Sequence, residues 1–169
     1  MVNALVGKFE PGARRFQARR VALEGQPSGT LAQMRVIWAA KFRRDTAAMV
    51  EALLRRDWSV LAYKPWPEQA VAERRPEWAY VRGLGLAANT SEPGPAVAGE
   101  LSDAAPTDDG WAYLWEHEMG ALHVYAARGG RWHHLATLPA DVWAELTEQL
   151  VVDVEARWCW LAQGEEKAA

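Results

Sequence analysis

Residues 111–138, WAYLWEHEMGALHVYAARGGRWHHLATL, decide the fold predicted from this sequence, and they hold all four histidines of the chain. Apolar and polar side chains alternate here, as they do on a strand whose successive residues point to opposite faces of a sheet. Met119-Gly120 and Gly129-Gly130 can each form a two-residue turn, and the glycine pair is the stronger signal because both central residues of a type I′ turn need positive φ. The stretch predicts three antiparallel strands joined by two tight turns.

Turns of this length set the register of the three strands. Trp115 would face Val124, Tyr113 would face Ala126, and Val124 would face Leu135. A slip of one residue would exchange the two faces of a strand, so the assignment depends on both turns being two residues long. The face assigned to the core comprises Tyr113, Trp115, Leu122, Val124, Ala126 and Leu135. The opposite face comprises Leu114, Glu116, His123, Tyr125, Trp132 and His134.

The second face raises the question of a metal site. Glu116 would lie opposite His123, and His134 opposite Tyr125. Two imidazoles and one carboxylate on neighbouring strands can hold a divalent metal ion. The competing interpretation is a partly solvated sheet face without a ligand. We assign no metal, no cofactor and no catalytic residue, and keep Glu116, His123 and His134 as the fallback ligand set.

Length and composition limit the class of protein. A chain of 169 residues, half of them hydrophobic, can form one compact domain or one domain with an arm. The single cysteine, Cys159, excludes an internal disulfide and a cysteine-based zinc site. We find no signal-peptide pattern and no run that could span a membrane, and we expect a cytoplasmic protein. The ten tryptophans predict a buried aromatic core or, alternatively, a stacking or interface surface.

Charge is unevenly distributed along the chain. Residues 1–64 contain 12 Lys or Arg and 5 Asp or Glu, a net charge of +7, whereas residues 65–169 contain 7 and 17, a net charge of −10. This asymmetry predicts either an acidic partner for the first part or pairing between the two parts within the molecule.

The first part of the chain predicts helices. Residues 1–10 form a short arm, residues 11–25 a helix with a basic stripe, and residues 30–57 a long helix interrupted in its apolar stripe at Asp45 and Thr46. Arginines on such a surface can grip phosphate oxygens, and the alternative is a solvated face or ion pairs with the acidic half. The candidate nucleic-acid-binding residues are Arg14, Arg15, Arg19, Arg20, Arg35, Arg43 and Arg44.

Residues 57–84 carry a motif. Asp57-Trp58, Leu61, Tyr63 and Trp66 fit the spacing D-W-x-x-L-x-Y-x-x-W. This segment resembles some actinobacterial and phage helix-turn-helix proteins, in which a long helix precedes the motif and a short helix pair follows it. The prolines of this segment, Pro65, Pro67 and Pro76, separately predict helices at 68–75 and 77–84. The resemblance implies DNA binding, with the helix that begins near Glu77 closest to the groove.

The rest of the chain completes the predicted organisation. Residues 85–110, without an aromatic residue and rich in Gly, Ala, Pro and Ser, predict a mobile loop or linker. Residues 140–162 predict a final helix. The expected fold is α+β: a mostly helical basic part at 1–84, the loop at 85–110, and a three-stranded antiparallel meander plus a C-terminal helix at 111–169, all of which can also form one compact domain.

Three functions are compatible with this pattern. We expect a nucleic-acid-binding or regulatory accessory protein without catalytic activity, which binds nucleic acid or an acidic protein but no membrane. The alternative is a protein–protein adaptor, including a homodimer formed through a sheet edge or exposed tryptophans. The second alternative is a small metal-dependent enzyme that uses Glu116, His123 and His134.

Overall fold

The computed structural model describes residues 3–10, 12, 14–65, 77–88, 92–102, 104–105, 109–116 and 118–166, with side chains as far as Trp160. The strands of this part of the chain are β1 (Asn3–Glu10), β2 (Arg15–Val21), β3 (Trp58–Leu61), β4 (Trp78–Val81), β5 (Gly85–Ala88), β6 (Val97–Glu100), β7 (Asp109–Glu116), β8 (Ala121–Arg128) and β9 (Arg131–Pro139). The helices are the π-helical turn η1 (Pro27–Leu31), α1 (Ala32–Ala40), α2 (Thr46–Leu53), α4 (Ala140–Ala144) and α5 (Glu148–Glu166).

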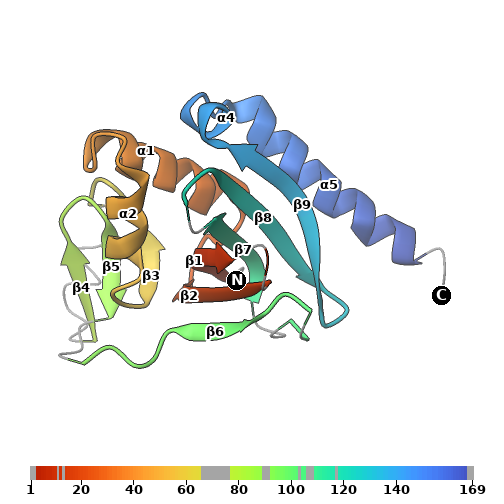
Figure 1. Cartoon of the computed structure of the whole chain (residues 1–169), viewed down its shortest axis with the longest axis horizontal. Coiled ribbons are helices and arrows are strands. Elements are labelled where there is room, and N and C mark those ends of the chain that lie inside the picture. Colours follow the sequence, from red (N-terminus) through yellow and green to blue (C-terminus); the bar gives the residue numbers. More distant parts are fainter. Residues whose placement is uncertain are drawn as a thin grey trace.

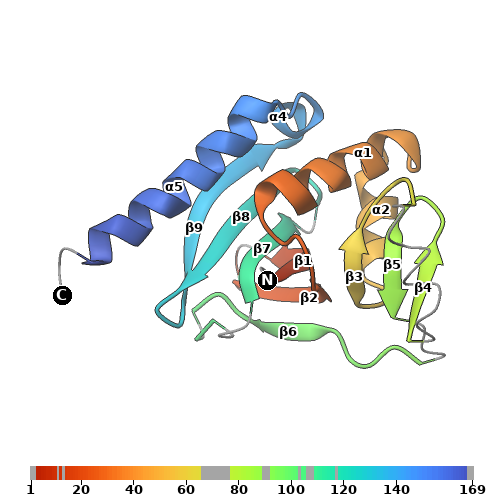
Figure 2. The same ribbon diagram turned by 180° about the vertical axis from the view of Figure 1, so that it is seen from behind.

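All nine strands belong to one mixed sheet, in which eight follow the order β4-β5-β3-β2-β1-β7-β8-β9 and β6 pairs with β2 beside this path. β1 lies at its centre, antiparallel to β2 and parallel to β7. The outer edge of β2 is shared, because β6 pairs with residues 15–18 and β3 with Val21. Helices α1, α4 and α5 lie on one side of the molecule and β6 runs along the other (Figures 1 and 2). No helix of the described residues is long and apolar enough to cross a membrane.

The sheet separates two apolar clusters. The larger one lies under the helices and contains the tryptophans Trp38, Trp58, Trp111, Trp115 and Trp143. The smaller one lies on the other face and contains Leu5, Phe9, Phe16, Ala18, Leu101, Ala112, Leu114 and Tyr125. Both faces of the central strands are therefore buried, which explains why so many residues of this chain are apolar.

The α+β prediction is wrong, because this is a largely β protein whose sheet takes strands from both halves of the chain, between residues 3 and 139. The expected arm at 1–10 is the central strand β1, and the expected basic helix at 11–25 contains β2. Seven residues of β2 pair with β1. On a strand, Arg19 and Arg20 point to opposite faces, so the helical basic stripe does not exist.

The expected long helix at 30–57 is also wrong, because it is divided into η1, α1 and α2. Arg43 and Arg44 adopt positive φ angles of 50° and 71° between the two α-helices. Asp45 then caps α2, where its side chain accepts a hydrogen bond from the Ala48 N–H at 2.9 Å. The polar pair Asp45-Thr46 thus starts a new helix, as such residues do at N-termini.

Residues 77–110 differ from the prediction as well. The helix expected at 77–84 is the strand β4, which forms a hairpin with β5. Gly83 supplies the positive φ of 75° that the turn between them requires. The segment expected to be a loop at 85–110 contains β5 and β6. The helix expected at 68–75 lies outside the described residues.

The three strands expected at 111–138 are present as β7, β8 and β9, within the large sheet instead of a sheet of their own. The Gly129-Gly130 turn is confirmed, with Arg128 paired with Arg131 and Tyr125 with His134, but Val124 pairs with Ala136 and not with Leu135 as predicted. The β7–β8 connection is two residues longer than predicted, so Trp115 pairs with Leu122 and Tyr113 with Val124. An even shift preserves the faces, and the predicted core face is buried. The final helix is divided into α4 and α5.

Candidate functional site

The predicted nucleic-acid-binding arginines do not gather on one surface. Arg19 points into the molecule, where only 8% of its side chain is exposed. Its guanidinium donates to the Leu54 carbonyl at 2.9 Å and to the Gly94 carbonyl at 2.6 Å. Arg19 therefore ties β2 to the end of α2 and to the segment before β6, and it is not accessible to a phosphate.

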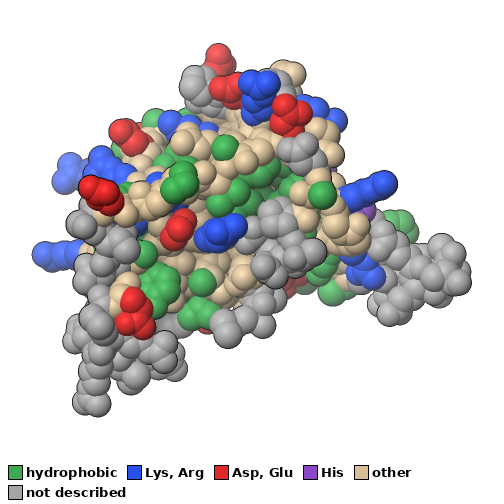
Figure 3. Space-filling model, turned by 90° about the horizontal axis from the view of Figure 1, so that it is seen from below, with side chains coloured by type: hydrophobic (Ala, Val, Ile, Leu, Met, Phe, Trp, Pro, Cys, Tyr) green, Lys and Arg blue, Asp and Glu red, His purple; other side chains and the backbone are tan. Residues whose placement is uncertain are grey.

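The other predicted arginines are distributed over different parts of the molecule. Arg35 donates two hydrogen bonds to the Ala144 carbonyl, at 3.0 and 2.6 Å. Arg44 lies over the Trp38 ring at 5.8 Å. Arg15 forms an exposed ion pair with Glu100 at 3.4 Å. Arg14 and Arg20 are exposed near the two ends of β2, and Arg43 is exposed between α1 and α2. The face in Figure 3 shows Lys and Arg side chains scattered among acidic ones.

The three fallback ligands do come together, on the sheet face opposite the helices. Glu116 from β7 lies 2.8 Å from the Nε2 atom of His123 on β8. The Nδ1 atom of His123 lies 3.4 Å from the Nε2 atom of His134 on β9. His123 is paired with Leu114 in the ladder, not with Glu116 as predicted, so the carboxylate reaches the imidazole diagonally across the strands.

Thr137 completes this cluster, and the sequence analysis missed it. Its Oγ1 atom lies 3.0 Å from His134 Nε2 and 3.3 Å from His123 Nδ1. In a regular strand, residues 134 and 137 would point to opposite faces. A bulge in β9, where the register with β8 shifts between Val124 and Tyr125, brings both to the same face. Sequence alternation alone gives no signal for it.

Aromatic rings form the floor of the cluster. Phe9 contacts His123 edge-on with a centroid distance of 5.2 Å, and Tyr125 lies 5.0 Å from His134. Partial burial of its ring lowers the pKa of His134, and the neighbouring His123 and Arg157 lower it further. A hydrogen bond with the Ala136 backbone has the opposite, smaller effect. Burial raises the pKa of the Tyr125 phenol, while Arg14 opposes the rise. The lowered pKa of His134 favours the neutral form of its imidazole.

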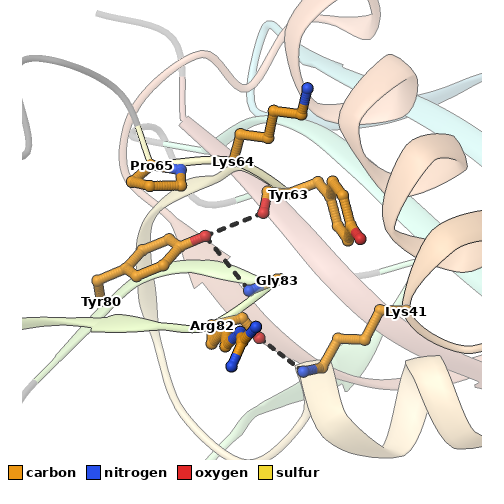
Figure 4. A pocket seen from close by; sticks show the side chains of 7 residues that line it. All are labelled: Lys41, Tyr63, Lys64, Pro65, Tyr80, Arg82 and Gly83. Atoms are coloured by element: carbon orange, nitrogen blue, oxygen red, sulfur yellow. Dashed lines mark hydrogen bonds between the residues drawn. The ribbon is translucent and has the colours of Figure 1, made fainter.

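A second group of polar side chains lines a pocket of about 500 Å³ at the other end of the sheet. The lining residues are Lys41, Tyr63, Lys64, Pro65, Tyr80, Arg82 and Gly83 (Figure 4). They come from the end of α1, the chain after β3 and the β4–β5 hairpin. Among these seven described residues, three are cationic and none is acidic, so the pocket can attract an anion.

Hydrogen bonds hold the walls of this pocket in place. The Tyr80 hydroxyl donates to the Tyr63 carbonyl at 2.9 Å and accepts from the Gly83 N–H at 3.3 Å (Figure 4). Lys41 donates to the Arg82 carbonyl at 2.6 Å. Sequence reasoning missed the pocket, because its members lie on three segments whose structure was predicted wrongly. The basic character of residues 1–64 was the one signal that pointed toward it.

Comparison with protein-family models, with curated proteins and with solved structures yields no significant match. The resemblance of residues 57–84 to helix-turn-helix proteins stays untested by these comparisons. In the structure, however, the segment expected to form the groove-binding helix is β4.

Proposed function

We propose that the protein is a non-catalytic nucleic-acid-binding accessory protein that holds a single-stranded segment at the pocket of Lys41, Lys64 and Arg82. The observation that supports this proposal is the combination of three cations with two tyrosines around one cavity of about 500 Å³. Proteins that bind single strands combine a positive groove, which follows the phosphates, with aromatic rings on which bases stack.

The pocket suits a single strand better than a duplex. Its cationic side chains surround a concave pocket. They do not lie along a helix or strand that could enter a groove of duplex DNA. Tyr63 and Tyr80 line the cavity and are partly exposed, so part of each ring can be offered to an unpaired base. The arginines first assigned to this role are spread over the molecule or turned inward, and the proposal does not use them.

Fluorescence anisotropy with a labelled single-stranded oligonucleotide tests the proposal. Binding should weaken with salt, and a Lys64→Gln/Arg82→Gln double variant should lower the slope of log K against log salt by about 1.4, since each phosphate contact on a single strand contributes about 0.7. A Tyr63→Ala variant should weaken binding about tenfold, because stacking contributes about 1–3 kcal/mol per base, and leave the slope unchanged.

The matched control is Arg131→Gln, which removes one exposed charge at the β8–β9 turn, far from the pocket. We expect it to leave affinity nearly unchanged. No binding at low salt, or an equal effect of the pocket variant and the control, would contradict the proposal.

One observation favours the adaptor as a second candidate function. On the outer side of α5, Trp160 is 72% exposed and Val152 55% exposed. Together with the exposed Ala156 and Cys159, they occupy positions i, i+4, i+7 and i+8, which share one helix face. Sedimentation velocity tests whether two copies associate there: a dimer that a Trp160→Glu variant turns into a monomer supports this candidate, and a monomer at all concentrations removes it.

A further inference from the structure

We propose that His123 and His134 form a two-imidazole site for a divalent late transition-metal ion such as Zn²⁺ or Cu²⁺, with Glu116 as the group that orients His123. The site lies on the sheet face opposite the helices, on other strands than the cationic pocket. It is therefore independent of nucleic-acid binding.

The spacing of the donor atoms carries the proposal. His123 Nδ1, His134 Nε2 and Thr137 Oγ1 form a triangle with sides of 3.4, 3.0 and 3.3 Å. Ligands about 2.0–2.1 Å from a tetrahedral Zn²⁺ ion are separated by roughly 3.3–3.4 Å, as its geometry requires. An ion can occupy the position facing all three atoms after movements of a few tenths of an ångström.

The contact between Glu116 and His123 is the second observation. Histidines that bind metals usually donate their other ring N–H to a carboxylate, which fixes the tautomer and the ring orientation. Glu116 Oε1 lies 2.8 Å from His123 Nε2. When Nε2 carries the proton and donates it to the carboxylate, Nδ1 presents its lone pair toward His134 and Thr137. Glu116 thus acts through His123 and is a positioning residue, not a ligand.

The ring packing reduces the movement that metal binding would require. The side chain of His123 is only 14% exposed, and it is held edge-on against Phe9. His134 is held by Tyr125. Preorganised side chains lose less conformational entropy on binding.

The donor set decides which ions bind. Among the described residues, no three His, Cys, Asp or Glu side chains surround a common metal position. A bound ion would therefore have two imidazole nitrogens and would complete its shell with the Thr137 hydroxyl and water. Imidazole favours Cu²⁺ and Zn²⁺, with Cu²⁺ the tighter, whereas Mg²⁺ and Ca²⁺ require oxygen ligands.

Calorimetric titration of the untagged full chain with Zn²⁺, and separately with Cu²⁺, tests the proposal. We expect one ion per chain, with Mg²⁺ not bound. His123→Ala and His134→Ala should each weaken binding at least tenfold, and Glu116→Gln about tenfold, since loss of an orienting carboxylate costs about 10–100-fold. The control is His133→Gln, because His133 lies next to His134 but its ring is directed to the Arg128 carbonyl at 3.3 Å.

A spectroscopic readout separates coordination from a merely structural effect. In ¹⁵N NMR spectra, Zn²⁺ should shift the Nδ1 resonance of His123 and the Nε2 resonance of His134. The Nε2 resonance of His123 should keep the chemical shift of a protonated nitrogen. Binding that is as tight in the His123→Ala and His134→Ala variants as in the parent chain would overturn the proposal. So would a shift of the His133 nitrogens in place of those two.

Discussion

An Arg19→Ala variant will lose about 3 kcal/mol of unfolding free energy, because the guanidinium of Arg19 is a structural group inside the sheet. The side chain donates to two carbonyls, at 2.9 Å to Leu54 and at 2.6 Å to Gly94. Hydrogen bonds that involve a charged group contribute roughly 1.5–3 kcal/mol each. We take the lower end of that range for both bonds, because water can reach the freed carbonyls once the side chain is removed.

Urea denaturation followed by tryptophan fluorescence measures this loss, since the core contains many tryptophans. The protein should remain folded without denaturant, as the total stability of a domain is about 5–15 kcal/mol. An Arg19→Lys variant, which keeps the charge but has a single nitrogen on a flexible stem, should lose an intermediate amount.

Arg15→Ala is the matched control, because it removes the same side chain from the same strand. Arg15 is 71% exposed and pairs with an exposed Glu100, so we expect a loss below about 1 kcal/mol. If Arg19→Ala and Arg15→Ala cost the same within about 0.5 kcal/mol, Arg19 does not hold β2 against α2 and the segment before β6, and its assignment as a structural group is wrong.

Three further predictions concern the core, the hairpins and the response to alkaline pH. Trp143→Ala should cost about 3–5 kcal/mol in urea denaturation, since Trp143 is 1% exposed among other aromatic rings, whereas Trp160→Ala, at 72% exposure, should change stability by less than about 0.5 kcal/mol. Gly85→Ala should lower the melting temperature clearly, because Gly85 has a φ of 143° and an added Cβ would lie 2.1 Å from a backbone oxygen of β3. Gly94→Ala is the control and should leave the melting temperature unchanged, because a Cβ added there has no other atom within 4 Å. Burial raises the pKa of Tyr113 well above the ordinary 10.0. As the pH rises above 10, the unfolded chain therefore releases a proton that the folded chain keeps, and the unfolding free energy falls. The phenolate absorbance of Tyr113 should appear only with unfolding, and a Tyr113→Phe variant should show a weaker dependence of stability on pH.

The strand β2 shows why the first half of the fold could not be predicted from local sequence. RFQARRV has only Phe16, Ala18 and Val21 as buried hydrophobic positions, and these fit neither a clean period of two nor a clean helical period. The segment is a strand because β1, β3 and β6 all pair with it. Those partners lie up to 85 residues away in the chain, and strand propensity depends on such context.

Composition was misleading for β5 and β6. GLAA and VAGE contain no aromatic residue and few β-branched ones, and a segment rich in small residues typically forms a loop. The small side chains have a structural reason at Gly85, where a Cβ would collide with β3. Close approach of neighbouring backbones thus selects small residues inside a sheet, and this selection resembles the composition of a linker.

Periodicity was sufficient where the strands are long and the turns are marked by glycine. In residues 111–138 it placed Tyr113, Trp115 and Val124 on the core face, and all three are buried. The register error at β7–β8 was two residues, which moves a side chain along its face but never across the sheet. For that reason Glu116 and His123 were predicted to be neighbours and are neighbours, through a diagonal contact instead of a direct pair.

Thr137 follows a different rule, because its position depends on a break in periodicity. Leu135 and Ala136 are consecutive, yet both pack in the larger cluster under the helices, whereas regular alternation would place them on opposite faces of the sheet. The bulge that accommodates them places one extra residue in β9 and turns Thr137 to the face of His134. The burial of Leu135 and Ala136 in the core is thereby the reason that the Thr137 hydroxyl lies beside the imidazoles of His123 and His134. The donor triangle of His123, His134 and Thr137 is thus a consequence of core packing on the opposite face, and it would be lost in any variant that restored regular alternation in β9.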